Sequence, residues 1–367
     1  MNGEQRRRLA FSSGRLSPVA ERVLSTQVLN RALLARQLLL ERADLSVARA
    51  LERVGGLQTQ YAPSAYIGLW SRLRGFRREM LTRALEQRLV VQATLMRATI
   101  HMVSARDFPL LAAAVRNGRR DWWLRVQAKQ LKKVDTEAAA SRVRKHLSKG
   151  PRRQAELVEL LKAEGFPPIA VAGAGMWVDL VRVPPSGTWE QRRADLYGLA
   201  DGWLDRSNAT EAEGMDHLIR RYLGAFGPAS LADLASWAGL PTATVRPVME
   251  QMELNRFRDE QGGVLFDLAR APLPAEDTPA PVRFLPQWDA TLLGHTRRTG
   301  ILPEPYRSLV FNTKTPQSVS TFLVDGVVAG KWRYQAGRVH LEPFERIPAS
   351  IRRELEEEGK RLAGFHA

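Results

Sequence analysis

Apolar residues recur at helical spacing through the first two-thirds of the chain. Ser25 or Thr26 stands just before the first such stripe, where a hydroxyl can cap the opening turn of a helix. The stripe itself consists of Leu29, Leu33, Leu34 and Leu38. The same pattern predicts further helices over residues 46–53, 66–73 and 77–88.

Residues 90–103 are rich in β-branched side chains, which predicts a hairpin. Farther along, Gly150-Pro151 and Gly227-Pro228 each break one helix and precede an Ala-acid-Leu sequence in the next. Helices are expected before these breaks, over residues 136–147 and 213–223. After the second break, two helices at 230–238 and 241–252 lead to a hairpin that turns at residues 261–263.

Helix–helix–helix–hairpin is the order of the winged-helix variant of helix-turn-helix proteins. The first copy of the repeat has a comparable order, with strands expected around 177–183 and 197–204, and the N-terminal block can be interpreted in the same way. We therefore predict an α+β protein with three tandem winged-helix units. The alternative is a set of packed helical hairpins.

A proline-rich linker separates these units from a C-terminal part with short strands, a hairpin turn at Asp325-Gly326 and a charged final helix at 351–362. The expected parts are a disordered basic segment at 1–22, winged-helix units at 23–106, 107–208 and 209–270, the linker at 271–282, and a β-rich domain with a DNA-contacting hairpin at 283–367.

The charge balance indicates a polyanionic partner. The 367-residue chain has 55 Lys and Arg against 39 Asp and Glu, a net charge of +16. Such a surplus favours nucleic acid over a membrane surface, although it can also serve solubility alone. No apolar stretch approaches the roughly 20 residues that span a bilayer, and the basic first 22 residues lack the apolar core of a secretory signal. We expect a cytoplasmic protein that associates with the nucleoid by binding DNA.

Several kinds of chemistry are excluded or unsupported. The absence of cysteine excludes disulfides, thiolate catalysis and cysteine-ligated metals. The six histidines are scattered without an HExxH pattern, so we expect no metal and no cofactor. No lysine is placed for Schiff-base chemistry, which favours simple hydrolysis over lyase activity.

The run Leu57-Gln58-Thr59-Gln60-Tyr61-Ala62 carries the candidate chemistry. Two glutamines at spacing i, i+2 project to one side of an extended segment. Each amide is both donor and acceptor, so the pair Gln58 and Gln60 can hold one water molecule without ionising. The alternative is that either glutamine only binds the backbone.

Four separated blocks give this chain a family resemblance. They are residues 56–63 (GLQTQYAP), 96–103 (MRATIHMV), 284–295 (FLPQWDATLLGH) and 323–333 (LVDGVVAGKWR). In this order they resemble the AlkZ/YcaQ-like family of winged-helix DNA glycosylases, from about Leu24 to Phe344. Gln58 and Gln60 match the Gln-x-Gln branch rather than the Gln-x-Asp branch. Thr59 departs from the usually apolar middle position, where its methyl group can substitute if it packs inward.

The resemblance implies a C-shaped protein that excises N-alkylated purines from double-stranded DNA, in base excision repair. In the matching branch, members protect antibiotic producers from their own DNA-alkylating products, so bulky adducts and interstrand cross-links are expected substrates. An N7-alkylated purine is cationic and already activated, so the enzyme need only position water at C1′ beside an oxocarbenium-like sugar. Gln58 and Gln60 are expected to do this, in a monomer with a shallow, open site.

Other residues are expected to contact DNA or substrate. His101 is favoured as a buried structural histidine, and Trp288 and Asp289 as a core aromatic and a turn cap. A basic stretch with Trp122-Trp123 also supports DNA binding through Arg119, Arg120, Arg125, Lys129, Lys132 and Lys133. The specific candidates for substrate or DNA contact are Arg97, His295, Arg297, Arg298, Lys314, Lys331 and Arg333.

Two other functions fit parts of the pattern. A non-catalytic winged-helix transcription regulator would suit the charge and fold, but needs neither the glutamine pair nor the C-terminal extension. A structural, chromatin-like protein would suit the charge alone. A regulator should prefer one DNA sequence, whereas a glycosylase should act on a lesion.

Overall fold

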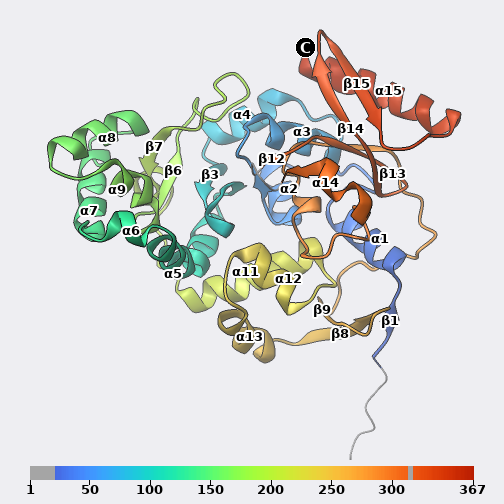
Figure 1. Ribbon diagram of the computed structural model, residues 1–367, viewed down its shortest axis with the longest axis horizontal. Helices are drawn as coiled ribbons and strands as arrows, with labels where there is room; N and C mark the ends of the chain where they lie inside the picture. Colours follow the sequence, from blue (N-terminus) through green and yellow to red (C-terminus); the bar gives the residue numbers. More distant parts are fainter. Residues whose placement is uncertain (1–20, 313–316) are drawn as a thin grey trace, which may run out of the picture.

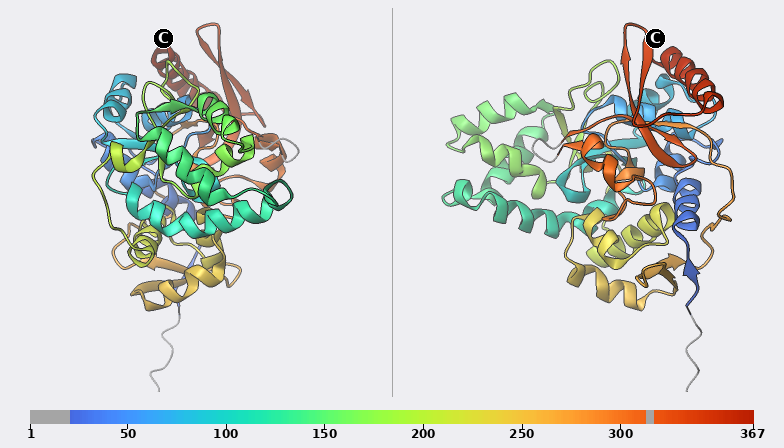
Figure 2. Two further views of the ribbon diagram at one scale, coloured as in Figure 1. Left: turned by 90° about the vertical axis from the view of Figure 1, so that its left-hand side faces the viewer. Right: turned by 45° about the vertical axis from the view of Figure 1, so that its right-hand side comes forward.

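The computed structural model describes residues 21–312 and 317–367, in a mixed arrangement of helices and strands. The predicted disordered segment therefore lies almost wholly outside the described residues, as does Lys314. Figure 1 shows α2 and α3 near the centre, α1 to their right, a lobe of α6–α9 at the left, α11–α13 below, and a terminal sheet with α15 at the upper right. Figure 2 shows the same parts from two further directions.

The N-terminal part confirms the predicted helices and hairpin. Ser25 and Ser46 cap the first two helices through their hydroxyls, and left-handed Gly55 ends the second. The elements are β1 (Val23–Leu24), α1 (Thr26–Arg36), α2 (Val47–Val54), β2 (Leu57–Gln58), α3 (Pro63–Arg72), α4 (Arg78–Glu86), β3 (Val90–Thr94), the short 3-10 turn η1 (Met96–Ala98) and β4 (Ile100–Ser104).

The second part contains the lobe and differs from expectation at its last strand. That strand was predicted over 197–204, but it ends at Leu199, and the chain continues directly into α10. At this junction the N–H of Ala200 donates to Asp179 O. The elements are α5 (Phe108–Val126), α6 (Ala128–Leu131), α7 (Thr136–Leu147), β5 (Arg152–Arg153), α8 (Gln154–Ala163), α9 (Pro168–Gly173), η2 (Ala174–Met176), β6 (Leu180–Arg182), β7 (Leu196–Leu199) and α10 (Ala200–Trp203).

The third part has the predicted order of three helices and a hairpin. Ser230 and Asp233 form a capping box at the start of α12, and left-handed Gly239 ends it. The elements are α11 (Glu211–Phe226), α12 (Leu231–Ala238), α13 (Thr242–Gln251), β8 (Leu254–Asp259) and β9 (Val264–Leu268). The division of the whole chain into three winged-helix units, with its boundaries, stays a prediction.

The C-terminal part contains the predicted hairpin turn at Asp325-Gly326 and the final helix, which is longer than expected. The elements are β10 (Arg283–Leu285), η3 (Ala290–Leu292), η4 (Glu304–Tyr306), α14 (Arg307–Val310), β11 (Phe311–Asn312), β12 (Gln317–Ser318), β13 (Thr321–Val324), β14 (Val327–Gln335), β15 (Arg338–Pro343) and α15 (Ala349–His366).

Strand pairing joins segments far apart in the sequence. The β2, β4 and β3 strands continue into β6, β7 and β5 to make one six-stranded sheet, because Gln92 and Ala93 of β3 pair with Arg182 and Val181 of β6. A three-stranded sheet has the order β1-β8-β9, and a four-stranded sheet has the order β10-β13-β14-β15. The six-stranded sheet thus connects the N-terminal part to the second part of the chain.

Apolar burial follows the same division. One large core runs through the N-terminal, third and C-terminal parts and continues into the second part at α5 and β6. It includes Tyr66, Tyr222, Phe226 and Phe284. The lobe has its own smaller core between α7, α8 and α9, around Val143 and Leu161. The helices α7–α9 of the lobe therefore pack around a core of their own, whereas the rest of the described chain shares the large core.

Three buried arginines tie the N-terminal helices to distant parts. Arg36 of α1 donates to both carboxylate oxygens of Asp267 on β9, at 2.7 and 2.8 Å. Arg31 of α1 pairs with Asp325 at the β13–β14 turn. Arg72 of α3 binds Asp289 in the C-terminal part. The first two contacts hold α1, and the third holds the end of α3, the helix that follows the glutamine motif.

Candidate active site around the glutamine motif

The glutamine motif begins on β2, at the edge of the six-stranded sheet. Gln58 lies opposite His101 of β4, and the N–H of Thr59 donates to Ile100 O at 2.8 Å. Gly56 has a left-handed φ of +82°, and a Cβ there would lie 2.9 Å from Val103 Cγ1. Only glycine therefore allows the chain to leave α2 and enter β2 so close to β4.

The two glutamines are held differently. Gln58 is only 8% exposed, and its Oε1 accepts a hydrogen bond from Arg97 Nη2 at 3.0 Å. Gln60 lies in the bend after β2, its side chain is exposed, and none of the described residues forms a hydrogen bond with it. The extended segment assumed from the i, i+2 spacing thus covers only the first glutamine.

Thr59 packs inward and is 1% exposed, which is the orientation in which its methyl group can replace an apolar residue. Its hydroxyl oxygen is buried without a hydrogen-bond partner among the described residues. An unpaired buried hydroxyl costs stability, so this position would suit an apolar side chain better.

Arg97, predicted to contact DNA or substrate, is half-buried and already engaged by protein. Besides Gln58 it binds the backbone oxygen of Trp237, at the end of α12. Burial, followed by the nearby charge of Arg298, lowers the pKa of Arg97 to about 10. The guanidinium therefore remains charged at neutral pH while it holds the first glutamine.

His101 is 2% exposed, and its Nδ1 lies 3.1 Å from Thr99 O. Burial, with a further contribution from Arg97, lowers the pKa of His101 to about 3. The imidazole is thus neutral at physiological pH, in agreement with the structural rather than the catalytic interpretation.

His295 is also held by protein. Its ring nitrogen Nε2 donates to Phe226 O at 2.9 Å, and the ring stands edge-on to Phe226. Burial lowers the pKa of His295, although Asp233 opposes this shift. Thr296 donates from both its backbone N–H and its hydroxyl to Asp233. The loop after η3 is therefore anchored to α11 through His295 and to α12 through Asp233.

The other candidate cations are distributed over two regions. Arg298 lies over the Phe311 ring at 5.1 Å and is close enough to lower the pKa of Arg97, whereas neighbouring Arg297 is exposed. Lys331 and Arg333 lie on β14, where both approach Glu342, at 3.2 and 3.5 Å. Arg97 thus contacts Gln58, and the charge of Arg298 is felt at Arg97, while the β14 pair belongs to the terminal sheet.

Trp288 and Asp289 behave partly as expected. Asp289 caps η3 through Thr291 N at 2.9 Å and pairs with Arg72, with both charged side chains 0% exposed. Trp288 is only half-buried rather than a core aromatic, and its φ of +60° is left-handed. Gly68 lies between this pair and the motif, since a Cβ there would be 3.4 Å from Leu57 Cδ1 and 3.8 Å from Asp289 Oδ2.

Sequence reasoning missed Arg192, which lies on the loop between β6 and β7. Its Nη1 donates to the hydroxyl of Tyr61 at 3.1 Å, and the guanidinium lies between the rings of Tyr61 and Trp189 at 5.8 and 5.9 Å. No local pattern marks a residue 131 positions from its partner. The lobe thereby contacts the residue that directly follows the glutamine pair.

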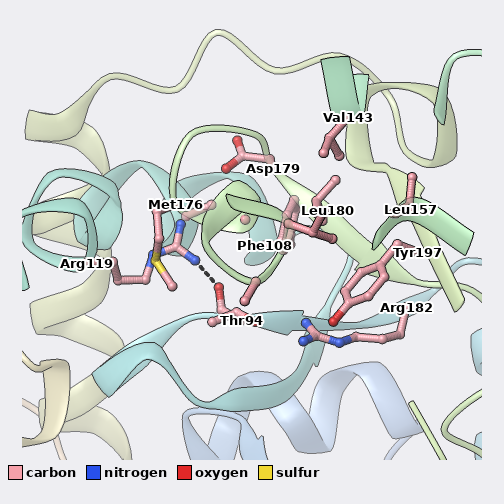
Figure 3. Close-up of a pocket in the computed structure, with 14 residues that line it drawn as sticks. Thr94, Phe108, Arg119, Val143, Leu157, Met176, Asp179, Leu180, Arg182 and Tyr197 are labelled. Atoms are coloured by element: carbon pink, nitrogen blue, oxygen red, sulfur yellow. Dashed lines mark hydrogen bonds between the residues drawn. The ribbon is translucent and has the colours of Figure 1, made fainter. Parts of the chain in front are cut away.

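The basic stretch on α5 and α6 is only partly a surface. Arg119 is 5% exposed, donates to Thr94 O and lines a cavity of about 70 Å³ between β3 and the lobe (Figure 3). Arg182 lines the same cavity, 5.1 Å from the Tyr197 ring. Arg119 is therefore not a DNA contact. The exposed members of the stretch are Trp122, Arg125, Lys129, Lys132 and Lys133.

Two features of the described residues, 21–312 and 317–367, bear on other functions. Within them no group of three or more His, Asp or Glu side chains is arranged to hold a metal ion. No helix in this described part is both long enough and apolar enough to cross a membrane.

Comparison with known proteins defines the class. Residues 51–365 match the family described as DNA glycosylase AlkZ-like. This match covers most of the chain, so the protein belongs to the family of AlkZ-like DNA glycosylases.

Among solved structures, the DNA glycosylase AlkZ of Streptomyces sahachiroi is similar over 93% of this chain and 97% of its own, with a TM-score of 0.77 and 21% identity. At that identity the likeness is one of fold. No curated protein matches the sequence.

Proposed function

We propose that this protein is a monofunctional DNA glycosylase that hydrolyses the N-glycosidic bond of N7-alkylated, cationic purines. The observation that carries the proposal is the position of the glutamine pair, with Gln58 held at the sheet edge by Arg97 and Gln60 exposed beside it. Membership of the glycosylase family supports DNA as the substrate.

The proposed reaction needs little acid–base chemistry. The bond between C1′ and N9 breaks, the bonding electrons pass to the purine, and the alkylated cation leaves as a neutral base. Water adds its oxygen to C1′ and releases one proton to solvent. Gln58 and Gln60 accept hydrogen bonds from this water and direct their carbonyl dipoles at the positive charge that develops on the sugar.

A neutral pair limits the range of substrates. A carboxylate would stabilise an oxocarbenium-like sugar more strongly than an amide dipole in a dry site. No general acid is invoked to protonate the leaving base, and His101, with its pKa lowered to about 3, is unsuited to that task. We therefore expect rapid release of labile cationic purines and poor activity on unmodified or neutral bases.

DNA binding is proposed to be electrostatic and independent of sequence. The exposed members of the α5–α6 stretch and Arg297 are the accessible candidates for phosphate contacts. Lys314, which lies outside the described residues, is proposed as a further candidate in the β-rich part, where a minor-groove contact is expected. Lys331 and Arg333 would have to exchange Glu342 for phosphate.

The lesion is proposed to include bulky adducts or interstrand cross-links made by a genotoxic natural product, as a self-resistance function. The glutamine motif on an edge strand, with an exposed second member, supports a shallow and open site. A bulky or cross-linked purine cannot swing freely out of the duplex, so such a site would act without full base flipping. A monomer would suffice.

A non-catalytic regulator is the second candidate, because α11, α12, α13 and the β8–β9 hairpin follow the order of a winged-helix DNA-binding unit. The two functions are separated by incubating the protein with duplexes of one sequence, with and without a single N7-methylguanine, and measuring free base. We expect release from the modified duplex alone. Binding that selects one sequence, with no release of N7-methylguanine or of a bulkier N7 adduct, would favour the regulator.

A further inference from the structure

Arg97 occupies an unusual turn of the backbone. It joins β3 to β4 through η1, and both Arg97 and the next residue, Ala98, have left-handed φ angles, of 52° and 53°. Two successive non-glycine residues in this region are strained, by about 1–3 kcal/mol each, and persist only where their surroundings hold them.

The surroundings that hold Arg97 come from the third part of the chain. Gly239, at the end of α12, packs directly on the strained turn, since a Cβ there would lie 2.8 Å from both Cα and N of Arg97. One arm of the guanidinium donates to Trp237 O on the same helix, and the other donates to Gln58 Oε1 at 3.0 Å. Arg97 thus connects α12 to the first glutamine.

No carboxylate pairs with this cation among the described residues: its two hydrogen-bond partners are both neutral oxygens. A guanidinium has donors only, so the amide of Gln58 must present Oε1 to Arg97 and turn Nε2 the other way. The amide oxygen has two lone pairs, and one remains for a proton of the attacking water. The contact therefore selects one of the two amide orientations.

We propose that Arg97 is a positioning residue for the glycosylase reaction, which fixes the amide of Gln58 in its working orientation and couples it to α12. This role, which rests on the proposed function, differs from a phosphate contact. In the folded protein both arms of the guanidinium are engaged by protein oxygens, and breaking these bonds to reach phosphate would release the glutamine.

A double-mutant cycle on base release separates the two roles. The variants are Arg97→Met, Gln58→Ala and their combination, assayed in single turnover on a duplex with one N7-methylguanine. Misplacing a catalytic group by about 1 Å costs about 100-fold in rate, so Arg97→Met should lose about this much. In the Gln58→Ala background it should lose nothing further, because its effect is transmitted through that side chain.

Affinity for DNA distinguishes a positioning role of Arg97 from a phosphate contact, because only loss of a phosphate contact should weaken binding. The dissociation constant for the duplex and its dependence on salt should stay as in the wild type. Arg97→Lys keeps the charge but cannot span both oxygens, so it should lose most of the rate with the same affinity. The opposite result would be that Arg97→Met lowers the rate by the same factor with and without Gln58→Ala, and reduces the slope of log affinity against log salt by about 1. That result would make Arg97 a phosphate contact and overturn the proposal.

Two further variants guard against misfolding. Arg97→Asn suits a left-handed residue, so it should fold and still lose the rate. Arg74→Met, at an exposed arginine paired with Glu41, should change neither rate nor affinity. The same cycle on urea midpoints tests the Arg97–Gln58 contact without catalysis: additive shifts would refute the contact. A wild type without base release would refute the proposed function, while the urea cycle still decides on the contact.

Discussion

Replacing Asp289 by Asn is expected to destabilise the protein severely, because it leaves a charged arginine unpaired in the core. Arg72 and Asp289 are both 0% exposed and are joined by hydrogen bonds of 2.7 and 2.9 Å. Arg72 also donates to Gly68 O and to Thr291 Oγ1. Removal of one member of such a buried pair costs about 3–5 kcal/mol, whereas exposed pairs contribute about 0–1 kcal/mol.

The assay is urea unfolding of four proteins: wild type, Asp289→Asn, Arg72→Met and the double variant. The double variant should be less destabilised than Asp289→Asn, with a coupling on the order of 2 kcal/mol, because no unpaired charge remains. Glu41→Gln, which breaks an ion pair exposed at 84% and 68%, is the matched control and should cost less than about 1 kcal/mol.

The sign of the pH effect follows from the same pair. Burial alone would raise the pKa of Asp289, but Arg72 and the bonds from Thr291 hold it below its ordinary value. The stability that this ionisation supplies is therefore complete above the unfolded pKa of about 3.9, and is lost as the pH falls through the lower folded pKa. A cost of Asp289→Asn below about 1 kcal/mol, with no recovery in the double variant, would refute the reasoning.

Three further changes test other parts of the account. Gly239→Ala should lower both the stability against urea and the rate of base release, because the added Cβ would lie 2.8 Å from the Arg97 backbone. Gly262→Ala, with a similar φ but nothing within 4 Å of the added Cβ, should cost only about 1–2 kcal/mol of stability. Equal costs for the two variants would contradict the close packing at Gly239. The pKa of His101 is lowered to about 3 in the folded protein, so below the unfolded pKa of about 6.5 unfolding takes up a proton and stability falls. His101→Gln should therefore remove about 1.4 kcal/mol of the stability that urea unfolding shows to be lost between pH 7.5 and 5.5. An unchanged loss would show that the imidazole is not buried in its neutral form. Thr59→Val should raise stability by about 1 kcal/mol without changing the rate of base release, since the hydroxyl has no hydrogen-bond partner among the described residues. A destabilised variant would show that the hydroxyl does form a hydrogen bond.

Elements with local signals were predictable from the sequence. Ser25 and Ser46 stand as caps where a hydroxyl was expected to begin a helix, and Gly55 ends α2 in the left-handed conformation that glycine favours. The helix expected over 136–147 has these bounds in the structure, because Asp135 accepts a hydrogen bond from its first turn. These signals act over a few residues and need no knowledge of the fold.

Pairing between distant strands was not predictable in the same way. The six-stranded sheet depends on β3 meeting β6, and the parallel pairing of Val23 and Leu24 with β8 joins residues more than 230 positions apart. Hydrophobic pattern sets which face of a strand is buried but not which strand it meets. The strand predicted over 197–204 was wrong in its second half, since β7 ends at Leu199 and residues 200–203 form the short helix α10.

The glutamine pair of the candidate site could be proposed from the sequence, whereas the residues that hold it could not. Gln58 and Gln60 are adjacent in a recognisable motif, so four blocks of sequence sufficed to propose them. Arg97 carried the right charge for a DNA contact, but its place depends on a left-handed turn and on Gly239, which no helical or strand pattern encodes. Arg192 reaches Tyr61 from the lobe and left no signal at all.

The central claim is that the glutamine pair performs the hydrolysis. It is tested most directly by single-turnover release of N7-methylguanine from duplex DNA, comparing the wild type with the Gln58→Ala, Gln60→Ala double variant at equal DNA binding. The account predicts release by the wild type and a fall to the spontaneous rate in the variant. Release that survives the double substitution would contradict it, leaving the activity but placing the water elsewhere.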